Sequence, residues 1–312
     1  MKKNRAVVLM GGISAERAIS LITGKACSLA LKKKGYKVFQ VDAKGNFSKK
    51  IKILKPNFIF NALHGKFGED GFVQKILENL KIPYTHSGVI SSKIAMDKAL
   101  SKFIFKKFKI PTPKYFVLNE VQRDKEGNKL NVKNEIKKNK LKFPLVFKPT
   151  NEGSSIGVSI CKKYDQLMKI IRRNKKYKDV MIEQYIPGQE IQVAVMGSKP
   201  LGAIELRPRR KFYDYKAKYS KSAKTQHIMP ASISKKKYTE VLKIAKKAHQ
   251  KIGCRGITRS DFRFYKNKFY LLEINTQPGM TALSLVPEIA RFKKISFENL
   301  VEWIAKDSSI NR

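Results

Sequence analysis

The first 88 residues of the chain alternate between short apolar runs and segments suited to helices. The runs at residues 5–10, 36–42 and 58–63 have the length and boundaries of buried strands. A helix is expected over residues 15–34, and residues 70–80 carry apolar side chains at helical spacing. Strands that alternate with helices are typical of a parallel sheet, so residues 1–88 are predicted to form a small α/β domain.

The rest of the chain mixes strands, helices and one irregular segment. A helix is predicted over residues 92–108, and an amphipathic helix over residues 236–252. Residues 207–230 follow neither the strand nor the helix period, and a long irregular stretch in a compact chain is usually functional. Strands are expected at residues 115–119, 144–149, 157–161 and 180–185.

The chain carries 67 basic and 24 acidic side chains, for a net charge of +43. Such a charge raises the hypothesis of nucleic-acid binding. The lysines, however, are spread along the whole sequence, and no zinc-finger, RNP or heptad pattern accompanies them. We therefore favour a charged, solvated surface with weak non-specific polyanion binding over a nucleic-acid function.

Two further features bear on where the protein works. No apolar run approaches the ~18 residues that a membrane-spanning helix needs, and the apolar run near the N-terminus is too short for a signal peptide. The cysteines, Cys27, Cys161 and Cys254, are far apart and lack metal-binding spacing. Reduced thiols in a cytoplasm are the simplest interpretation.

Residues 259–275 read as a β-hairpin whose pairing is set by its hydrophobic pattern. A turn at residues 266–268 would place Tyr265 opposite Phe269 and Asp261 opposite Glu273. Arg259 would then lie opposite Asn275. The side chains expected on the opposite, core-facing side are those of Phe262, Phe264, Leu272 and Ile274.

Facing carboxylates destabilise a hairpin unless something positive lies between them. One interpretation of Asp261, Glu273 and Asn275 is a Mg²⁺ site, because hard oxygen ligands with room for phosphate suit that ion. The other is a solvent-facing charged surface on which Arg259 balances one acid. The amide of Asn275 on the same face, followed by a Gln-Pro-Gly turn, favours the metal site.

Two loops are candidates for binding a nucleotide, although the chain has no GxxxxGK[ST] motif. In residues 148–158, Lys148 ends a strand, two glycines free the backbone, and Ser154 adds a hydroxyl. Such a loop can close over phosphates. An ordinary hairpin loop, however, can have the same sequence pattern. Glu183 and Glu190 flank a segment that could present backbone groups to a base and a carboxylate to a ribose.

Taken together, these motifs resemble the D-alanine–D-alanine ligase family of the ATP-grasp superfamily. The motifs that carry the resemblance are GGISAERAIS (11–20), LHGKFGEDG (63–71), KPTNEGSSIG (148–157), FYDYKAKY (212–219), RSDF (259–262) and LLEINTQPGMTALSLVP (271–287). The resemblance implies an α/β fold with a three-domain ATP-grasp architecture. It divides the chain into a Rossmann-like N-terminal domain (1–88), a central ATP-grasp subdomain (89–183) and a C-terminal ATP-grasp subdomain (184–312).

The resemblance also implies a reaction. ATP phosphorylates the carboxylate of one D-alanine, and the amine of a second D-alanine displaces phosphate, which yields the dipeptide for peptidoglycan. Two Mg²⁺ ions, with Mn²⁺ as an alternative, would assist. The implied enzyme is a cytoplasmic homodimer with no specific nucleic-acid partner and no membrane partner.

Family roles carry over to individual positions of this chain. The residues expected to contact ATP are Lys98, Lys148, Glu183, Gln184, Ile186, Glu190 and Lys218. Catalytic roles fall on Glu16, Ser154, Lys218, Tyr219, Arg259, Gly279 and Ser284. The remaining substrate contacts are His64 and Leu285, with Ser284 also near the second substrate, and the metal ligands are Asp261, Glu273 and Asn275. Residues 212–224 are expected to form a lid.

Two alternatives accompany this interpretation. The chain could be another ATP-grasp carboxylate–amine ligase or a D-alanine–D-lactate ligase, and Tyr219 favours an amine as the second nucleophile. A non-catalytic basic nucleic-acid-binding protein would instead bind DNA or RNA tightly without turning over ATP.

Overall fold

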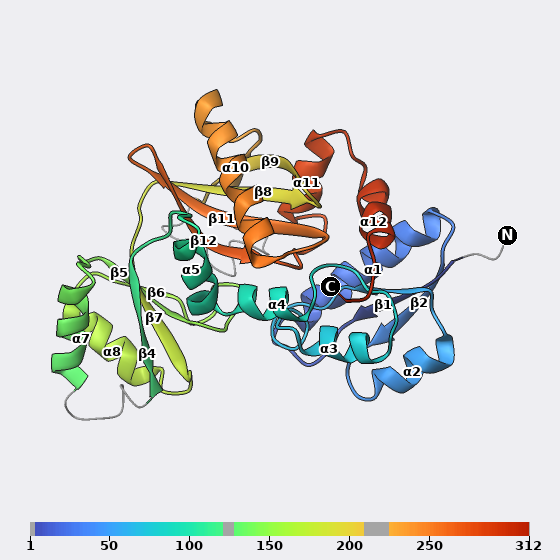
Figure 1. Cartoon of the computed structure of the whole chain (residues 1–312), viewed down its shortest axis with the longest axis horizontal. Coiled ribbons are helices and arrows are strands. Elements are labelled where there is room, and N and C mark those ends of the chain that lie inside the picture. The colour runs from blue at the N-terminus through green and yellow to red at the C-terminus, as the bar shows by residue number, and fades with distance from the viewer. Residues whose placement is uncertain (1–3, 121–127, 209–224, 312) are drawn as a thin grey trace.

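The computed structural model describes residues 4–120, 128–208 and 225–311, which form three β-sheets with helices packed around them (Figure 1). Elements from the N-terminal end lie on one side of the molecule and the elements from β4 to β7 on the other. The five-stranded sheet lies between them in Figure 1. Helices α4 and α5 run between the outer parts (Figure 1).

The N-terminal sheet confirms the predicted parallel arrangement, with strand order β2-β1-β3 and both pairings parallel. Its strands are β1 (Arg5–Met10), β2 (Lys37–Asp42) and β3 (Phe58–Asn61). The helices of this region are α1 (Arg17–Lys33), α2 (Phe47–Leu54) and α3 (Phe72–Asn79). The carboxyl ends of these parallel strands lead into the loops that carry Glu16 and His64.

The second sheet has four antiparallel strands in the order β4-β7-β5-β6. Its strands are β4 (Tyr115–Asn119), β5 (Leu145–Pro149), β6 (Ser159–Cys161) and β7 (Asp179–Gln184). Its helices are α7 (Asn128–Lys138) and α8 (Tyr164–Arg173). All four strands were expected from the sequence. Phe147 and Ile182 belong to the hydrophobic core that packs against this sheet.

The third sheet has five strands in the order β10-β9-β8-β11-β12. The strands are β8 (Gln189–Met196), β9 (Lys199–Arg207), β10 (Gln226–Ile228), β11 (Ile257–Tyr265) and β12 (Lys268–Asn275). The helices are α4 (Val89–Met96), α5 (Lys98–Lys107), α10 (Lys235–Ile252), α11 (Leu285–Phe292) and α12 (Phe297–Lys306). Sequence reasoning did not identify β8 and β9, and β10 lies inside the segment expected to be irregular.

The helix predicted over residues 92–108 is wrong as a single helix. The chain leaves the helical conformation at Asp97, where φ is −82° and ψ is 105°, so α4 and α5 are separate. The Asp97 carboxylate accepts hydrogen bonds from the backbone N–H groups of Ala99 and Leu100 at 2.8 and 3.0 Å. Asp97 is therefore the N-cap of α5, and this cap makes Lys98 the first residue of the new helix.

The hairpin of β11 and β12 confirms that Asp261 lies opposite Glu273, but the predicted turn is wrong. The turn has two residues, 266 and 267, whose φ angles are 47° and 61°. Tyr265 consequently pairs with Lys268 and not with Phe269. Positive φ at both central positions is typical of the tight turns that match the twist of a hairpin.

A β-bulge restores the register that the shorter turn would have lost. The pairing shifts between Asp261 and Phe262, because Leu272 is an extra residue on β12. Leu271 consequently enters the core, whereas Leu272, expected on the core face, lines a cavity next to Glu273. The bulge thus allows an apolar core and a charged face to coexist on one short hairpin.

The C-terminal end of the chain returns to the N-terminal sheet. One hydrophobic core combines residues of β1 and β3 with residues of β9, α11 and α12, including Val8, Phe60, Ile204 and Val301. Lys33 on α1 lies 2.9 Å from Glu298 on α12, and the backbones of Tyr84 and Ser309 form a bridge. This shared core holds the N-terminal loops against the third sheet. The domain boundaries predicted after residues 88 and 183 stay a prediction.

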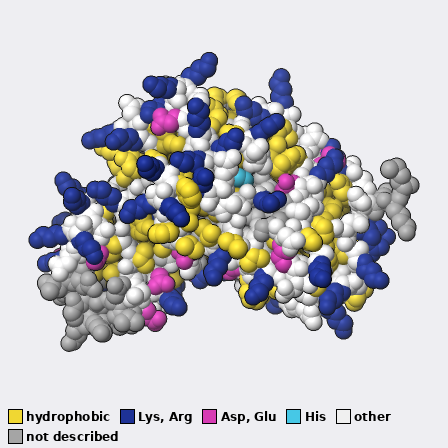
Figure 2. Space-filling view, viewed as in Figure 1, with side chains coloured by type: hydrophobic (Ala, Val, Ile, Leu, Met, Phe, Trp, Pro, Cys, Tyr) yellow, Lys and Arg dark blue, Asp and Glu magenta, His cyan; other side chains and the backbone are white. Residues whose placement is uncertain are grey.

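The surface is dominated by basic side chains. Figure 2 shows Lys and Arg scattered over the visible face without gathering into one stripe, and Asp and Glu are few. Within the part of the chain that the structure describes, every helix is too short or too polar to cross a bilayer.

His249 generates a prediction about stability. It is buried on α10, and its Nδ1 lies 2.8 Å from the hydroxyl of Thr258. Burial lowers the pKa of His249 to about 4, and a weaker attraction to Asp307 opposes this shift. The unfolded chain binds the proton near pH 6.5, as free histidine does, so acid favours unfolding.

The free energy of unfolding should therefore fall as the pH drops from about 6.5 to about 4, by up to about 3 kcal/mol from this group. Urea unfolding of the wild type and of His249→Gln at several pH values measures this contribution. The variant should be less stable near pH 7 but show a flatter pH dependence. An unchanged slope in the variant would assign the acid sensitivity to other groups.

Candidate active site

Two adjoining cavities lie where the three sheets meet, and they share Lys98, Glu152 and Glu273 in their walls. The empty volumes are about 950 and 830 Å³, which suits small-molecule ligands. The predicted residues that line the first are Glu16, His64, Lys98, Ser154, Arg259, Glu273, Asn275, Gly279, Ser284 and Leu285. Those that line the second are Lys98, Lys148, Glu183, Gln184, Ile186, Glu190, Asp261 and Glu273. Lys218, Tyr219 and the rest of the expected lid lie outside the described residues.

The facing carboxylates are each accompanied by a cation. Arg259 donates from Nε and Nη2 to the two oxygens of Asp261, at 2.7 and 3.0 Å. The Nζ of Lys98 lies 3.4 Å from Oε2 of Glu273. Asp261 and Arg259 are largely buried, so these charges act with little screening. The cations offset the repulsion between the two acids, with Arg259 balancing one acid as the sequence allowed.

Asn275 completes this polar face. Its side-chain oxygen accepts a hydrogen bond of 2.9 Å from the backbone N–H of Gln277, so the amide is held in one orientation. Glu273 lines both cavities, whereas Asn275 lines the first and Asp261 lines the second. No group of three or more His, Cys, Asp or Glu that could hold a metal occurs within residues 4–120, 128–208 and 225–311.

Lys98 ties the loop after β5 to this face. Its Nζ donates to the carbonyl oxygen of Glu152 at 2.6 Å, and its backbone N–H donates to the carbonyl of Thr150 at 3.0 Å. The carboxylate of Glu152 in turn accepts from Lys66 at 2.6 Å. The first residue of α5 thereby connects the N-terminal loops, the loop of residues 150–158 and the hairpin.

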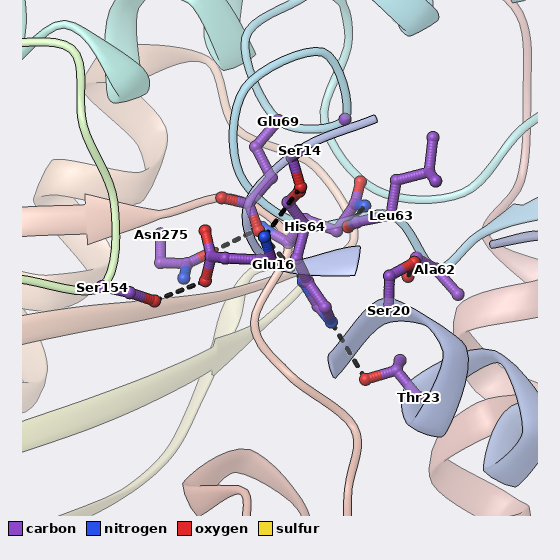
Figure 3. Close-up of polar contacts among 12 residues, drawn as sticks. Ser14, Glu16, Ser20, Thr23, Ala62, Leu63, His64, Glu69, Ser154 and Asn275 are labelled. Atoms are coloured by element: carbon purple, nitrogen blue, oxygen red, sulfur yellow. Dashed lines mark hydrogen bonds and ion pairs between the residues drawn. The ribbon is translucent and has the colours of Figure 1, made fainter. Parts of the chain in front are cut away.

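The loop of residues 150–158 has an unusual backbone. Ser154 and Ser155 have φ angles of 49° and 60°, in the left-handed region that non-glycine residues rarely occupy. Such conformations cost free energy and cluster at ligand-binding sites. The hydroxyl of Ser154 donates to a carboxylate oxygen of Glu16, which is the contact that the resemblance implied (Figure 3). The loop therefore meets the start of α1 in the wall of the first cavity.

Glu16 is a buried carboxylate at the N-terminal end of α1. Its backbone N–H donates to the hydroxyl of Ser14 at 3.1 Å, and that hydroxyl donates to the carbonyl of His64 at 2.6 Å. Gly65 packs directly beside it: a Cβ there would lie 2.6 Å from Oε2 of Glu16, and its φ is +72°. Only glycine fits this position without displacing the Glu16 carboxylate.

His64 is also buried, and both of its ring nitrogens have partners within the protein. Nδ1 lies 3.1 Å from Oε1 of Glu69, and Nε2 lies 2.9 Å from the hydroxyl of Thr23 (Figure 3). Burial raises the pKa of Glu69, although the neighbouring His64 opposes the shift. Sequence reasoning missed Glu69, even though it lies inside the motif at residues 63–71.

In the second cavity, Glu183 is flanked by two lysines. The Nζ of Lys148 lies 2.8 Å from Oε1 of Glu183, and the Nζ of Lys102 lies 2.5 Å from Oε2. Burial alone would raise the pKa of Glu183, but the attraction of the two lysines outweighs burial and lowers it. Glu183 is therefore an ionised carboxylate in the wall of a pocket that combines apolar side chains with other charged ones. Sequence reasoning also missed Lys102.

The segment that follows Glu183 shapes the rest of the second cavity. The side chain of Gln184 is bound to the backbone of Lys142, at 2.9 Å to its N–H and 2.8 Å to its carbonyl, so this amide does not point at a ligand. At the far end, Glu190 forms an ion pair of 3.0 Å with Arg263. The apolar lining includes Val146, Ile156, Val158, Ile186 and Leu272. These walls suit a flat aromatic base.

Another part of the first cavity's wall is formed by the loop before α11. Gly279 packs against Ser284, whose hydroxyl accepts a hydrogen bond of 2.9 Å from the backbone N–H of Thr281. Ser284 is the N-cap of α11, and Leu285 is its first residue. Backbone N–H groups at the start of a helix favour an anion. This part of the cavity wall is thus suited to a carboxylate.

The two cavities differ in the side chains that they offer to a ligand. The second offers apolar side chains for a base and lysines for phosphates, whereas the first offers the Glu16 carboxylate and the N-terminus of α11. Their shared wall carries Lys98 and Glu273, so the end of a bound nucleotide would meet a ligand in the first cavity. Such an arrangement suits the transfer of a group from one ligand to the other.

Comparisons with known proteins agree with this geometry. Residues 40–87 match the family described as D-ala D-ala ligase N-terminus, and residues 104–306 match D-ala D-ala ligase C-terminus. The chain is 59% identical over 308 residues to a D-alanine–D-alanine ligase of Pelagibacter ubique (strain HTCC1062), covering 99% of both chains. It is 44% identical over 321 residues to that of Chelativorans sp. (strain BNC1), covering 100% of both.

Two solved structures are also similar. The D-alanine–D-alanine ligase of Bacillus anthracis complexed with ATP has a TM-score of 0.84 and 31% identity. A second structure of the Bacillus anthracis ligase has a TM-score of 0.85 and 34% identity, and each comparison covers 97% of both chains.

Proposed function

Because the chain belongs to the D-alanine–D-alanine ligase family, we propose that it joins two molecules of D-alanine at the expense of ATP, for peptidoglycan synthesis. The observation that supports this function most directly is the meeting of the two cavities at Lys98 and Glu273. A nucleotide in the apolar cavity would direct its terminal phosphate into the polar cavity, where an amino acid fits.

The first step makes a poor electrophile reactive. A carboxylate oxygen of the first D-alanine attacks the terminal phosphorus of ATP, the bond to the bridging oxygen breaks, and ADP leaves. Lys98 and Lys148 neutralise charge on the phosphates. Glu16 binds the ammonium of this D-alanine, and Ser154 holds the Glu16 carboxylate in place. His64, buried beside Glu69, completes the wall near the first substrate.

The second step forms the amide. The unprotonated amine of the second D-alanine attacks the carbonyl carbon of D-alanyl phosphate, and a tetrahedral intermediate forms. Arg259 and the N–H of Gly279 stabilise its oxyanion. The bond from carbon to the phosphate oxygen then breaks, phosphate leaves, and the nitrogen loses a proton. Ser284 and Leu285, at the start of α11, bind the carboxylate of the second D-alanine.

The residues present fit a magnesium site. Asp261, Glu273 and Asn275 supply hard oxygen atoms from one face of the hairpin, and too few of them to hold an ion without phosphate oxygens. We propose that they hold Mg²⁺, two ions in all, or Mn²⁺ in its place. When bound, the metal would neutralise charge on the transferring phosphoryl group. Arg259 and Lys98 already offset these acids, so the site does not depend on metal to fold.

The remaining expectations are part of the same proposal. Lys218 and Tyr219, in the expected lid, would reach the transferring phosphate and the Ser154–Glu16 pair. We also propose a cytoplasmic location, since the reaction consumes ATP, and a homodimer, which rests on the family resemblance alone. A nucleic-acid function is not favoured, because the basic side chains are scattered and the acids instead converge on the two cavities.

The function is tested by phosphate release from ATP. Release should require D-alanine, should be absent with L-alanine alone, and should yield D-alanyl-D-alanine by mass spectrometry. With D-alanine and D-lactate together, the dipeptide should dominate at neutral pH. Equal ATP turnover without D-alanine, or a dominant depsipeptide, would contradict the proposal.

The metal assignment predicts the behaviour of the double variant Glu273→Gln with Asn275→Ala. It should lose ATP turnover while keeping its fold, because removing one of two facing acids relieves repulsion and Lys98 keeps its hydrogen bond to the carbonyl of Glu152. Circular dichroism and thermal unfolding check the fold, and Mg²⁺ titration of the activity checks the site. Dipeptide synthesis near the wild-type rate at low Mg²⁺ would refute the assignment.

The packing of Gly65 against Glu16 predicts a difference between two matched variants. Gly65→Ala and Gly45→Ala both place alanine at positive φ, +72° and +81°, but a Cβ at Gly45 has nothing within 4 Å. Both should lose about 1–2 kcal/mol of stability from backbone strain. Only Gly65→Ala displaces the Glu16 carboxylate.

Steady-state kinetics separates the two effects. Gly65→Ala should raise the KM for the first D-alanine by about tenfold, as expected for a loss of ~1.4 kcal/mol of binding energy, while Gly45→Ala keeps the wild-type KM. If both variants behave alike, Glu16 does not bind the substrate ammonium.

A further inference from the structure

Lys102 is a charged residue with no exposed surface. Its side chain is 0% exposed, and it lies on α5 one turn after Lys98. Lysines are almost never fully buried unless they are paired, because leaving water is costly for an ammonium. Neither cavity is lined by Lys102, so it does not face a ligand directly. The folding cost indicates a role that a surface lysine could not perform.

The contacts of Lys102 connect two sheets. Its Nζ lies 2.5 Å from Oε2 of Glu183 on β7 and donates to the hydroxyl of Thr112 at 2.6 Å. That hydroxyl donates to the carbonyl of Leu271 on β12 at 2.9 Å. The ring of Tyr115 lies 5.6 Å from Nζ. Lys102 thus links the four-stranded sheet to the five-stranded sheet behind the second cavity.

Glu183 receives different support from its two lysines. Lys148 contacts Oε1 and lines the second cavity, so a bound phosphate or base can compete for its ammonium. Lys102 contacts Oε2 from behind, where no ligand reaches. Only Lys102 can hold the carboxylate in one orientation both before and after a nucleotide binds.

We propose that Lys102 is a positioning residue for the nucleotide, which keeps Glu183 ionised and turned so that its carboxylate accepts a hydrogen bond from an amino group on the base. This inference rests on the proposed function and adds a residue to it. An ionised carboxylate only accepts hydrogen bonds, so it selects a base that carries an exocyclic amino donor over one that carries a carbonyl there. Adenine has that donor and hypoxanthine has the carbonyl.

The charge of Lys102 gives this role a dependence on pH. Burial lowers its pKa to about 8, and the attraction of Glu183 partly opposes burial. The other groups that act on it are Lys148, which lowers the pKa, and Glu273, which raises it. The ammonium therefore loses its proton as the pH rises through about 8, and the Glu183 carboxylate then keeps only Lys148.

The experiment compares Lys102→Met with Lys106→Met, an exposed lysine on the same helix that serves as the control. Calorimetric titration with ATP·Mg²⁺ without D-alanine measures nucleotide binding apart from the reaction. Lys102→Met should weaken ATP binding by about tenfold, the effect of losing ~1.4 kcal/mol from a buried ion pair. In Lys102→Met the preference for ATP over ITP should fall, while kcat at saturating ATP should stay within about threefold of the wild-type value. The control Lys106→Met should match the wild type in all three measurements.

The pH dependence distinguishes positioning from general destabilisation. In the wild type the Kd for ATP should rise above pH 8, and in Lys102→Met it should be flat. If Lys102→Met does not fold, the wild-type titration and Lys102→Gln, which keeps a donor but not the charge, provide the same test. Unchanged ATP binding in a folded variant, an unchanged ATP preference, or a flat wild-type curve would overturn the proposal. D-alanine-dependent phosphate release by the wild type is scored separately, so the proposed function can stand while this inference fails.

Discussion

Asp261 and Glu273 face each other across β11 and β12, and the arrangement of the site depends on how this repulsion is offset. Arg259 binds Asp261 from the same strand, and Lys98 reaches Glu273 from the first turn of α5. Lys98 also holds the carbonyl of Glu152, which brings the loop of residues 150–158 to the same point. The acidic face is therefore compatible with folding only where three separate segments converge. That convergence is also what joins a nucleotide cavity to an amino-acid cavity.

Buried charges recur around this centre, and each is matched to a partner from another element. Glu183 on β7 pairs with Lys148 on β5 and Lys102 on α5, and His64 contacts Glu69 and Thr23. Burying a charge costs free energy that the partner must recover, so these pairs fix the positions of their elements. A site built in this way holds its carboxylates in place before substrate arrives, which is the preorganisation that group transfer requires.

The sequence predicted the parallel N-terminal sheet, because apolar strands alternate with helices there. It also predicted the facing acids, because side-chain alternation leaves few registers for an amphipathic hairpin. It did not predict the bulge at Leu272, since a two-residue turn with a bulge and a three-residue turn place Asp261 opposite Glu273 equally well. The break at Asp97 was readable as an N-cap signal, but the apolar spacing continued across it. Lys102 was missed because a lysine on a basic helix looks like a surface residue, and only the fold shows that it is buried. The loops that carry Glu16, His64 and Ser154 come from distant parts of the chain, and their meeting was inferred only from the family resemblance.

The central claim is that ATP activates the carboxylate of D-alanine before the amide forms. D-Alanine labelled with ¹⁸O in its carboxylate tests this claim, because the oxygen that attacks phosphorus leaves with the phosphate. The released phosphate, examined by mass spectrometry or ³¹P NMR, should contain one ¹⁸O atom for each dipeptide made from fully labelled substrate. Phosphate with no ¹⁸O would show that ATP is cleaved without attack by the carboxylate, and would contradict the account.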